Sequence, residues 1–122
     1  GARLAGRKDV KTFQTLNLKE AKDRPARMII HKIGLGKTRD LHIQVLAEDN
    51  LPVKAAVIRI LDPNSTPNLM EVTTGADGTV SHQIKLNGER HQLTVLVTGS
   101  DLRENICLWN REGGKDEAVP NH

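Results

Sequence analysis

The fold is decided between Leu41 and Gly99, where the chain reads LHIQVLAEDNLPVKAAVIRILDPNSTPNLMEVTTGADGTVSHQIKLNGERHQLTVLVTG. Short segments of alternating apolar and polar residues are separated there by proline, Asn-Gly and Asp-Gly, and no stretch shows the period of an amphipathic helix. This pattern is typical of a small antiparallel β-sandwich, which we expect to have about seven strands. Because sandwiches of this kind serve unrelated proteins, function must be argued from particular residues.

Composition limits the classes of function. The 122 residues suit one domain, and a chain of this size buries roughly two-thirds of its unfolded surface. Cys107 is the single cysteine, so no disulfide forms within the chain. Phe13 and Trp109 are the only Phe, Tyr or Trp residues, which predicts an aliphatic core. Two rings offer little for a stacking platform, which argues against a sugar-binding module or a single-strand nucleic-acid binder.

Hydropathy predicts no insertion into a membrane. No apolar run approaches the roughly 18 residues that a membrane span needs, and residues 1–10 lack the apolar region of a signal peptide. The leading Gly1 fits a processed start, so a signal peptide in the full gene product stays open, as does whether the chain is a fragment of a larger protein. An extracytoplasmic location (periplasm, cell surface or virion) is the expectation, with the cytoplasm left open.

Charge is distributed unevenly. Residues 1–40 hold eleven Lys or Arg against four Asp or Glu, a net charge of +7, whereas residues 41–122 have a net charge of −4. The cations nearest the start are Arg3, Arg7, Lys8 and Lys11. They either meet an anionic partner or pair with the acidic body, and the second interpretation is the simpler one.

These patterns predict that the chain has three parts. Residues 1–25 fit neither the helical nor the strand pattern and are predicted to form a basic, partly disordered arm. Residues 26–110 form the β-sandwich domain, and residues 111–122 form a frayed, polar C-terminal tail.

The first two strands are predicted at Arg27–Ile33 and Leu41–Ala47, joined as a hairpin. The loop Gly34-Leu35-Gly36-Lys37 between them ends like a phosphate-binding P-loop. That motif also needs a glycine where His31 stands and a helix afterwards, so the segment is interpreted as a hairpin loop.

The next strand, Val53–Leu61, has two apolar registers, which requires a bulge near Lys54-Ala55. We place its buried face on Ala56, Ile58 and Ile60. A short strand follows at Met70–Thr74, after an exposed loop at Asp62–Asn68 that is rich in turn-forming residues.

Asn87-Gly88 is the strongest short-range hairpin signal in the chain, since a type I′ turn needs two residues with positive φ. It predicts that Thr79–Leu86 pairs directly with Glu89–Thr98, with Ile84 opposite His91. A last strand is expected at 106–109.

Three motif groups, at 51–60, 73–80 and 93–97, occur in a recognisable order. They are Leu51-Pro52-Val53 with Ala56, Ile58 and Ile60, then Thr73-Thr74-Gly75-Ala76-Asp77-Gly78-Thr79-Val80, then Leu93-Thr94-Val95-Leu96-Val97. This order resembles bacterial Ig-like and carboxypeptidase-regulatory-like domains over about half of the chain. The resemblance implies a stalk, spacer, folding aid or docking surface without catalytic residues of its own.

A second resemblance is to the transthyretin-like fold and its hydrolytic relatives that open hydroxyisourate. Those enzymes carry a histidine where Gln44 stands, and a C-terminal Tyr-Arg-Gly-Ser signature that a chain without tyrosine lacks.

His82 and His91 are weak candidates for a metal site. In the predicted hairpin they are diagonal neighbours, about 7–8 Å apart, with Glu89 nearby. A metal site needs three or four ligands, so two histidines at the margin of the core are the simpler interpretation. Half-buried, neutral histidines would make the sheet less stable in acid.

The remaining candidates each have a structural alternative. Cys107, between two apolar residues, is predicted to be buried rather than nucleophilic. Trp109 either fills the core, which is the favoured interpretation, or anchors a partner. The tripeptide Asn64-Ser65-Thr66 matches the N-glycosylation pattern but is explained by turn chemistry. The aspartates predicted to form Asx-turns rather than calcium ligands are Asp49, Asp62, Asp77 and Asp101.

The leading hypothesis is a non-catalytic Ig-like module, with no cofactor, that docks a protein partner in a bacterial or phage surface, secretion or envelope assembly. Its candidate surfaces are the loop carrying Asn64, Ser65 and Thr66, the edge of the strand at 27–33, Trp109, and the basic arm with Arg3, Arg7, Lys8 and Lys11.

Two alternatives stay open. One is binding of nucleic acid or another anionic partner by the basic arm. The other, more distant, is a transthyretin-like hydrolase that uses His31, His42, His82 or His91 as its base. The identity of the partner and the oligomeric state are open at this stage.

Overall fold

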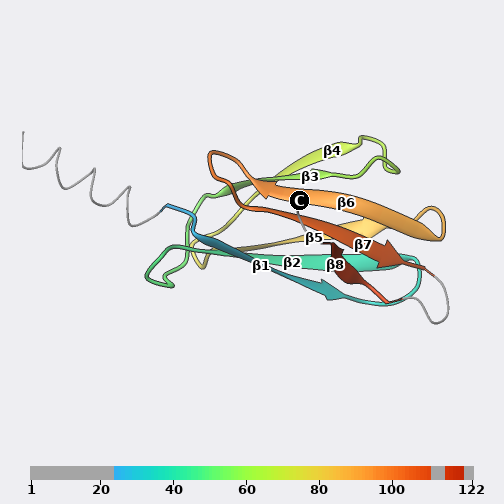
Figure 1. The fold of residues 1–122 in the computed structure, drawn as a ribbon, viewed down its shortest axis with the longest axis horizontal. Helices are drawn as coiled ribbons and strands as arrows, with labels where there is room; N and C mark the ends of the chain where they lie inside the picture. Colours follow the sequence, from blue (N-terminus) through green and yellow to red (C-terminus); the bar gives the residue numbers. More distant parts are fainter. Residues whose placement is uncertain (1–23, 111–114, 120–122) are drawn as a thin grey trace, which may run out of the picture.

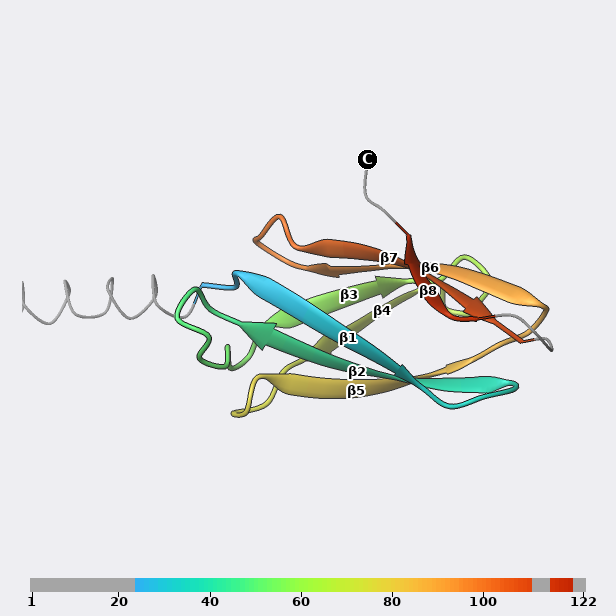
Figure 2. The same ribbon diagram turned by 60° about the horizontal axis from the view of Figure 1, so that its bottom comes forward.

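The computed structural model describes residues 24–110 and 115–119, and these form two antiparallel sheets packed face to face (Figure 1). Sheet A has the order β1-β2-β5, and its strands are β1 (Arg27–Ile33), β2 (Thr38–Leu46) and β5 (Thr79–Lys85). Sheet B has the order β4-β3-β6-β7-β8, and its strands are β4 (Leu69–Thr73), β3 (Val57–Leu61), β6 (Arg90–Val97), β7 (Arg103–Trp109) and β8 (Glu117–Val119). The predicted all-β sandwich is confirmed, with eight strands in the described residues. Figure 2 shows β1, β2 and β5 as one layer of the molecule.

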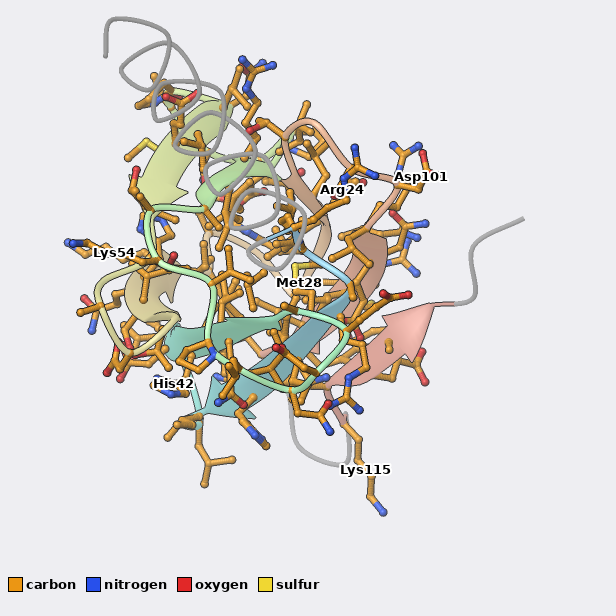
Figure 3. The ribbon with its side chains drawn as sticks, turned by 90° about the vertical axis from the view of Figure 1, so that its left-hand side faces the viewer. Arg24, Met28, His42, Lys54, Asp101 and Lys115 are labelled. Carbon is orange, nitrogen blue, oxygen red and sulfur yellow. The ribbon has the colours of Figure 1, made fainter. Side chains whose placement is uncertain are left out.

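The core between the sheets is aliphatic, as predicted. Its buried members include Leu41, Ile43, Leu93 and Ile106, and burying each such side chain contributes about 1.5–3 kcal/mol. Met28, near the centre of Figure 3, packs against this cluster. In the part of the chain that the structure describes, no helical segment has the length and apolar character to cross a membrane.

The predicted buried face of the third strand is confirmed. Ala56, Ile58 and Ile60 are 7%, 0% and 1% exposed. The irregularity expected near Lys54-Ala55 is a turn in which Ala55 has φ +61°, so the strand starts at Val57.

The predicted hairpin between β1 and β2 is confirmed, with His31 opposite His42. Its loop has glycines at the two positions with positive φ, Gly34 at +115° and Gly36 at +77°. The strand β2 follows directly, so the segment has none of the structure of a phosphate-binding loop.

The predicted hairpin across Asn87-Gly88 is wrong. Strand β5 pairs with β2, and β6 pairs with β3 and β7, so the two strands belong to different sheets. Gly88 has φ +138°, and Asn87 is not among the residues with positive φ, so the turn is not of type I′.

A side chain explains the difference. The backbone N–H of Asn87 donates to Nε2 of His91 (2.9 Å), and the N–H of the preceding residue, Leu86, donates to the carbonyl of Lys37 (2.7 Å). A two-residue hairpin would use neither of these bonds. They hold the turn in the shape by which the chain passes from sheet A to sheet B.

The C-terminal stretch contributes structure that the sequence did not predict. Residues Glu117–Val119 form β8 on the edge of sheet B, paired with β7. Just before it, Asp116 accepts from Nε of Arg39 (2.6 Å) and from the backbone N–H of Trp109 (2.9 Å). Arg39 is 3% exposed and also donates to carbonyls of Gly36 and Thr38 (2.9 and 2.8 Å) and to that of Trp109. The expectation of a frayed tail is therefore wrong for the described residues 115–119.

The loops gather at two ends of the sandwich (Figure 1). We call one the network end; it holds the β1–β2 loop, the β3–β4 loop, the β5–β6 turn and Asp116. We call the other the turn end; it holds the β2–β3, β4–β5 and β6–β7 loops. Residues labelled at the turn end in Figure 3 include Arg24 and Asp101.

Candidate partner-binding site

The β3–β4 loop, Asp62–Asn68, projects from the network end, and its shape is fixed from within. The N–H of Asn64 donates to Oδ1 of Asp62 (3.1 Å), which is the predicted Asx-turn. The hydroxyl of Ser65 donates to Oδ2 of the same carboxylate (2.6 Å). Asp62 is 3% exposed, whereas Asn64 and Thr66 are exposed. The loop therefore presents a polar outer surface on a buried anchor.

The Asp62 carboxylate is contacted in turn by a second buried side chain, that of His91. His91 is fully buried, and its Nδ1 lies 3.1 Å from Oδ2 of Asp62. On the other side of the ring, Nε2 lies 2.9 Å from both the backbone N and the side-chain Oδ1 of Asn87. The amide Nδ2 of Asn87 donates to the carbonyl of Asn64 (2.7 Å). These bonds join the β3–β4 loop to the β5–β6 turn as one unit.

This group has the residue types of a hydrolytic triad but not its connections. In a triad the hydroxyl donates to the histidine and the carboxylate orients the ring. Here Ser65 donates to Asp62, and Nε2 of His91 is occupied by Asn87. The arrangement positions a loop and has no nucleophile–base pair.

A hollow of about 500 Å³ opens beside the loop, between β4 and β5. Apolar residues lining it are Ile60, Met70 and Ile84, and Lys85 also contributes to the lining. Met70 is 37% exposed, and its neighbour Leu69 is 45% exposed. Within the described ranges, β4 pairs only with β3 and β5 only with β2, so an unpaired strand edge lies on each side of the hollow.

His82 also lines the hollow, from the inward side of β5. Burial lowers the pKa of its imidazole below the ordinary value. His91 belongs to the other sheet and is engaged by Asp62 and Asn87. The hairpin that would make the weak metal candidates His82 and His91 diagonal neighbours does not form.

Trp109 lies at the end of β7 and is half-buried, outside the aliphatic core cluster. The guanidinium of Arg90 lies 5.5 Å from the centre of its ring, a cation–π contact. The side-chain amide of Asn64 donates to the carbonyl of Arg90 (3.3 Å). The favoured core-filling interpretation is therefore wrong, and Arg90 connects the tryptophan to the loop.

The remaining predicted residues are the four cations of the basic arm and Cys107. Arg3, Arg7, Lys8 and Lys11 lie outside the described residues. Cys107 is buried, as predicted, and its burial raises the pKa of its thiol.

Two further Asx-turns are confirmed. Oδ1 of Asp49 accepts from the N–H of Leu51, and Oδ1 of Asp77 accepts from that of Thr79, both at 3.1 Å. The bonds from Thr79 lower the pKa of the Asp77 carboxyl. Among the described residues, no group of three or more His, Cys, Asp or Glu side chains is placed to hold a metal ion.

The sequence analysis missed Arg39 and the Asp62–His91 contact. One signal was present for His91, because it occupies the apolar register of β6, in line with Leu93 and Val95. A polar residue at such a position must find a buried partner. Arg39 stands in the same way in line with Leu41 and Ile43 on β2, but its partner lies 77 residues away.

Comparison with protein-family models, curated proteins and solved structures finds no match for this chain.

Proposed function

We propose that this chain is a non-catalytic, Ig-like interaction module that docks a protein partner through the hollow and the Asp62–Asn68 loop. The setting we propose is a bacterial or phage surface, secretion or envelope assembly outside the cytoplasm. The observation that carries the proposal is the hollow with an apolar lining between two unpaired strand edges, beside a loop held by buried hydrogen bonds.

The strand order supports the Ig-like part of the proposal. In constant-type Ig sandwiches the first, second, fourth and fifth strands face the third, sixth and seventh. Strands β1, β2 and β5 here face β3, β6 and β7, whereas β4 lies in the second sheet beside β3, the place of an additional strand in variable-type domains.

The geometry of the hollow supports the docking part. An extended segment of a partner can add to an exposed sheet edge through backbone hydrogen bonds, while its side chains fill neighbouring pockets. Ile60 and Ile84, 1% and 4% exposed, belong to the lining, and exposed Met70 lies at its margin. A loop that is already ordered loses little conformational entropy on binding.

The test replaces Met70, at the hollow, with arginine. Its matched control is Leu51→Arg at the turn end, since Leu51 is also apolar and is 60% exposed. A partner isolated with the wild-type chain is purified, and its Kd for each variant is measured by calorimetry. We expect Met70→Arg to weaken binding by about 1.4 kcal/mol or more, which is tenfold in Kd, and Leu51→Arg to leave it unchanged. Equal affinity for Met70→Arg and wild type would place the interface elsewhere.

The basic arm is tested separately. Replacing Arg3, Arg7, Lys8 and Lys11 with alanine removes an electrostatic contribution if the arm contacts an anionic partner. Binding of duplex DNA that weakens steeply with salt and is lost in this variant would favour the nucleic-acid alternative.

A further inference from the structure

We infer that His31 and His42, on the outer face of sheet A, form a two-histidine binding site for a divalent transition metal ion such as Zn²⁺. The two residues are directly opposite each other in the β1–β2 register. Their ring centres are 6.4 Å apart, and the ring planes are inclined by 31°. This site is independent of the hollow and of the proposed docking function.

The distance between the rings suits a shared ion. An imidazole nitrogen lies about 2.0–2.1 Å from zinc, which places the centres of two rings on one tetrahedral ion about 5 Å apart. The rings therefore need to approach by about 1 Å from their observed positions, and cross-strand partners with Cβ atoms about 4.5–5.5 Å apart allow this by small side-chain rotations.

Both side chains are accessible for such a rotation. His31 is exposed and His42 is partly exposed, while their neighbours Ile30, Leu41 and Ile43 point into the core. Figure 3 shows His42 at the surface, beside the ribbons of sheet A. An ion can therefore reach the pair, and the third and fourth ligands that a metal site needs come from water or from a second copy of the chain.

A neighbouring hydroxyl orients one of the two ligands. Oγ of Ser81, on β5, lies 3.1 Å from Nδ1 of His42. A hydroxyl that accepts a hydrogen bond from Nδ1–H leaves the lone pair of Nε2 for the metal, which is the arrangement that supporting residues give metal-bound histidines. Ser81 is thus a positioning residue.

Two carboxylates lie on the same side of the molecule as the pair. Asp40 is two residues from His42 on the same outward face of β2. Asp77 lies close enough for the charge of His42 to contribute, after its hydrogen bonds with Thr79, to the lowered pKa of its carboxyl. Each carboxylate attracts a cation that binds the two rings.

The experiment titrates the full chain with zinc sulfate at pH 7.5, with calorimetry for affinity and side-chain ¹⁵N NMR to identify the ligating ring nitrogens. The variants are His31→Gln, His42→Gln and, as the control that also removes one histidine, His82→Gln. We expect each of the first two to weaken zinc binding by at least about tenfold, because loss of even a supporting residue weakens a metal site by about 10–100-fold. His82→Gln is expected to leave the affinity unchanged.

The results of this titration either support the two-histidine site or overturn it. Perturbed ¹⁵N shifts of both His31 and His42, with one zinc per chain, support the assignment. One zinc per two chains with the same dependence on both histidines also supports it, with the ligand set completed by a second copy. Zinc affinity that is unchanged in either His31→Gln or His42→Gln, or equally reduced in His82→Gln, would overturn it. Unchanged thermal midpoints of the variants without metal establish that the fold is intact.

Discussion

The network end and the turn end of the sandwich are held by different kinds of contact. At the turn end the loops close mainly through backbone hydrogen bonds, such as that from the N–H of Val45 to the carbonyl of Gly78 (2.9 Å). Side chains also contribute there. Asp49 and Asp77 accept from nearby backbone N–H groups, and the buried hydroxyl of Thr74 donates to the carbonyl of Val53 (2.7 Å) and accepts from the N–H of Ala56 (2.8 Å). At the network end, the buried side chains of Arg39 and His91 join segments far apart in the sequence.

Substitutions at the two ends should differ in how much they destabilise the fold. A backbone turn depends on local residue types, so it survives most substitutions outside its own few positions. A buried polar network depends on each member, because removal of one leaves its partners buried without hydrogen bonds. Substitutions at the network end should therefore be the more damaging.

Arg39→Ala should have the largest effect. It leaves Asp116 and the carbonyl of Trp109 without their buried donor, and breaking a buried ion pair costs about 3–5 kcal/mol. Guanidinium unfolding measures the loss. The control is Arg59→Ala, which removes an exposed ion pair with Glu71 and is expected to cost about 0–1 kcal/mol. Equal losses for the two variants would show that burial adds nothing to the Arg39 pair.

His91→Phe should come next, with a loss of about 2–3 kcal/mol, because Asp62 and the N–H of Asn87 lose their partner. Hydrogen exchange at the amides of Asn64 and Asn87 should become faster than in wild type. The matched control, Gln92→Phe, changes the exposed neighbour on the same strand and should leave both rates unchanged. Unaltered exchange in His91→Phe would mean that other contacts order the loop.

Gly78→Ala probes the turn end. An added Cβ would lie 2.7 Å from Cβ of Pro52 and 2.9 Å from the carbonyl oxygen of Val45, at φ +74°. Gly99→Ala is the control, since Gly99 has a similar φ of +72° with no atom within 4 Å. We expect Gly78→Ala to be less stable than Gly99→Ala by about 1–3 kcal/mol, the usual effect of overpacking. The same stability for both would show that only φ matters there.

The smallest effect should be the dependence of stability on pH that comes from His82. Burial lowers its pKa in the folded chain, so below the unfolded value of about 6.5 the unfolded chain binds the proton more readily. The contribution of this group is therefore lost as pH falls below about 6.5. Unfolding curves at several pH values should show a shallower decline for His82→Gln than for wild type. Parallel declines would remove His82 as a cause.

The local parts of the structure were predictable. The β1–β2 hairpin, the buried face of β3 and the Asx-turns at Asp49, Asp62 and Asp77 all follow from residues within a few positions of one another. The position of the candidate loop was also predicted, because Asp62–Asn68 is rich in turn formers. The hollow beside it was not, since β4 and β5 are brought together only by the folding of both sheets.

The wrong hairpin prediction at Asn87-Gly88 shows what an alternating pattern cannot predict. An alternating pattern tells which residues face the core, and it correctly places Ile84 and Leu93 inside. It does not tell whether two such strands pair within one sheet or face each other across two sheets, because the buried face is the same in both arrangements. The contact between His91 and Asn87 belongs to the second arrangement.

The sequence by itself determined the all-β class, the aliphatic core and the turns of the turn end, because alternation and turn chemistry act over a few neighbouring residues. Only the tertiary structure decided which strands pair, where Arg39 and His91 find their partners, and that His31 meets His42 on an open face. Those contacts join residues from different strands, and no local pattern records the distance between them.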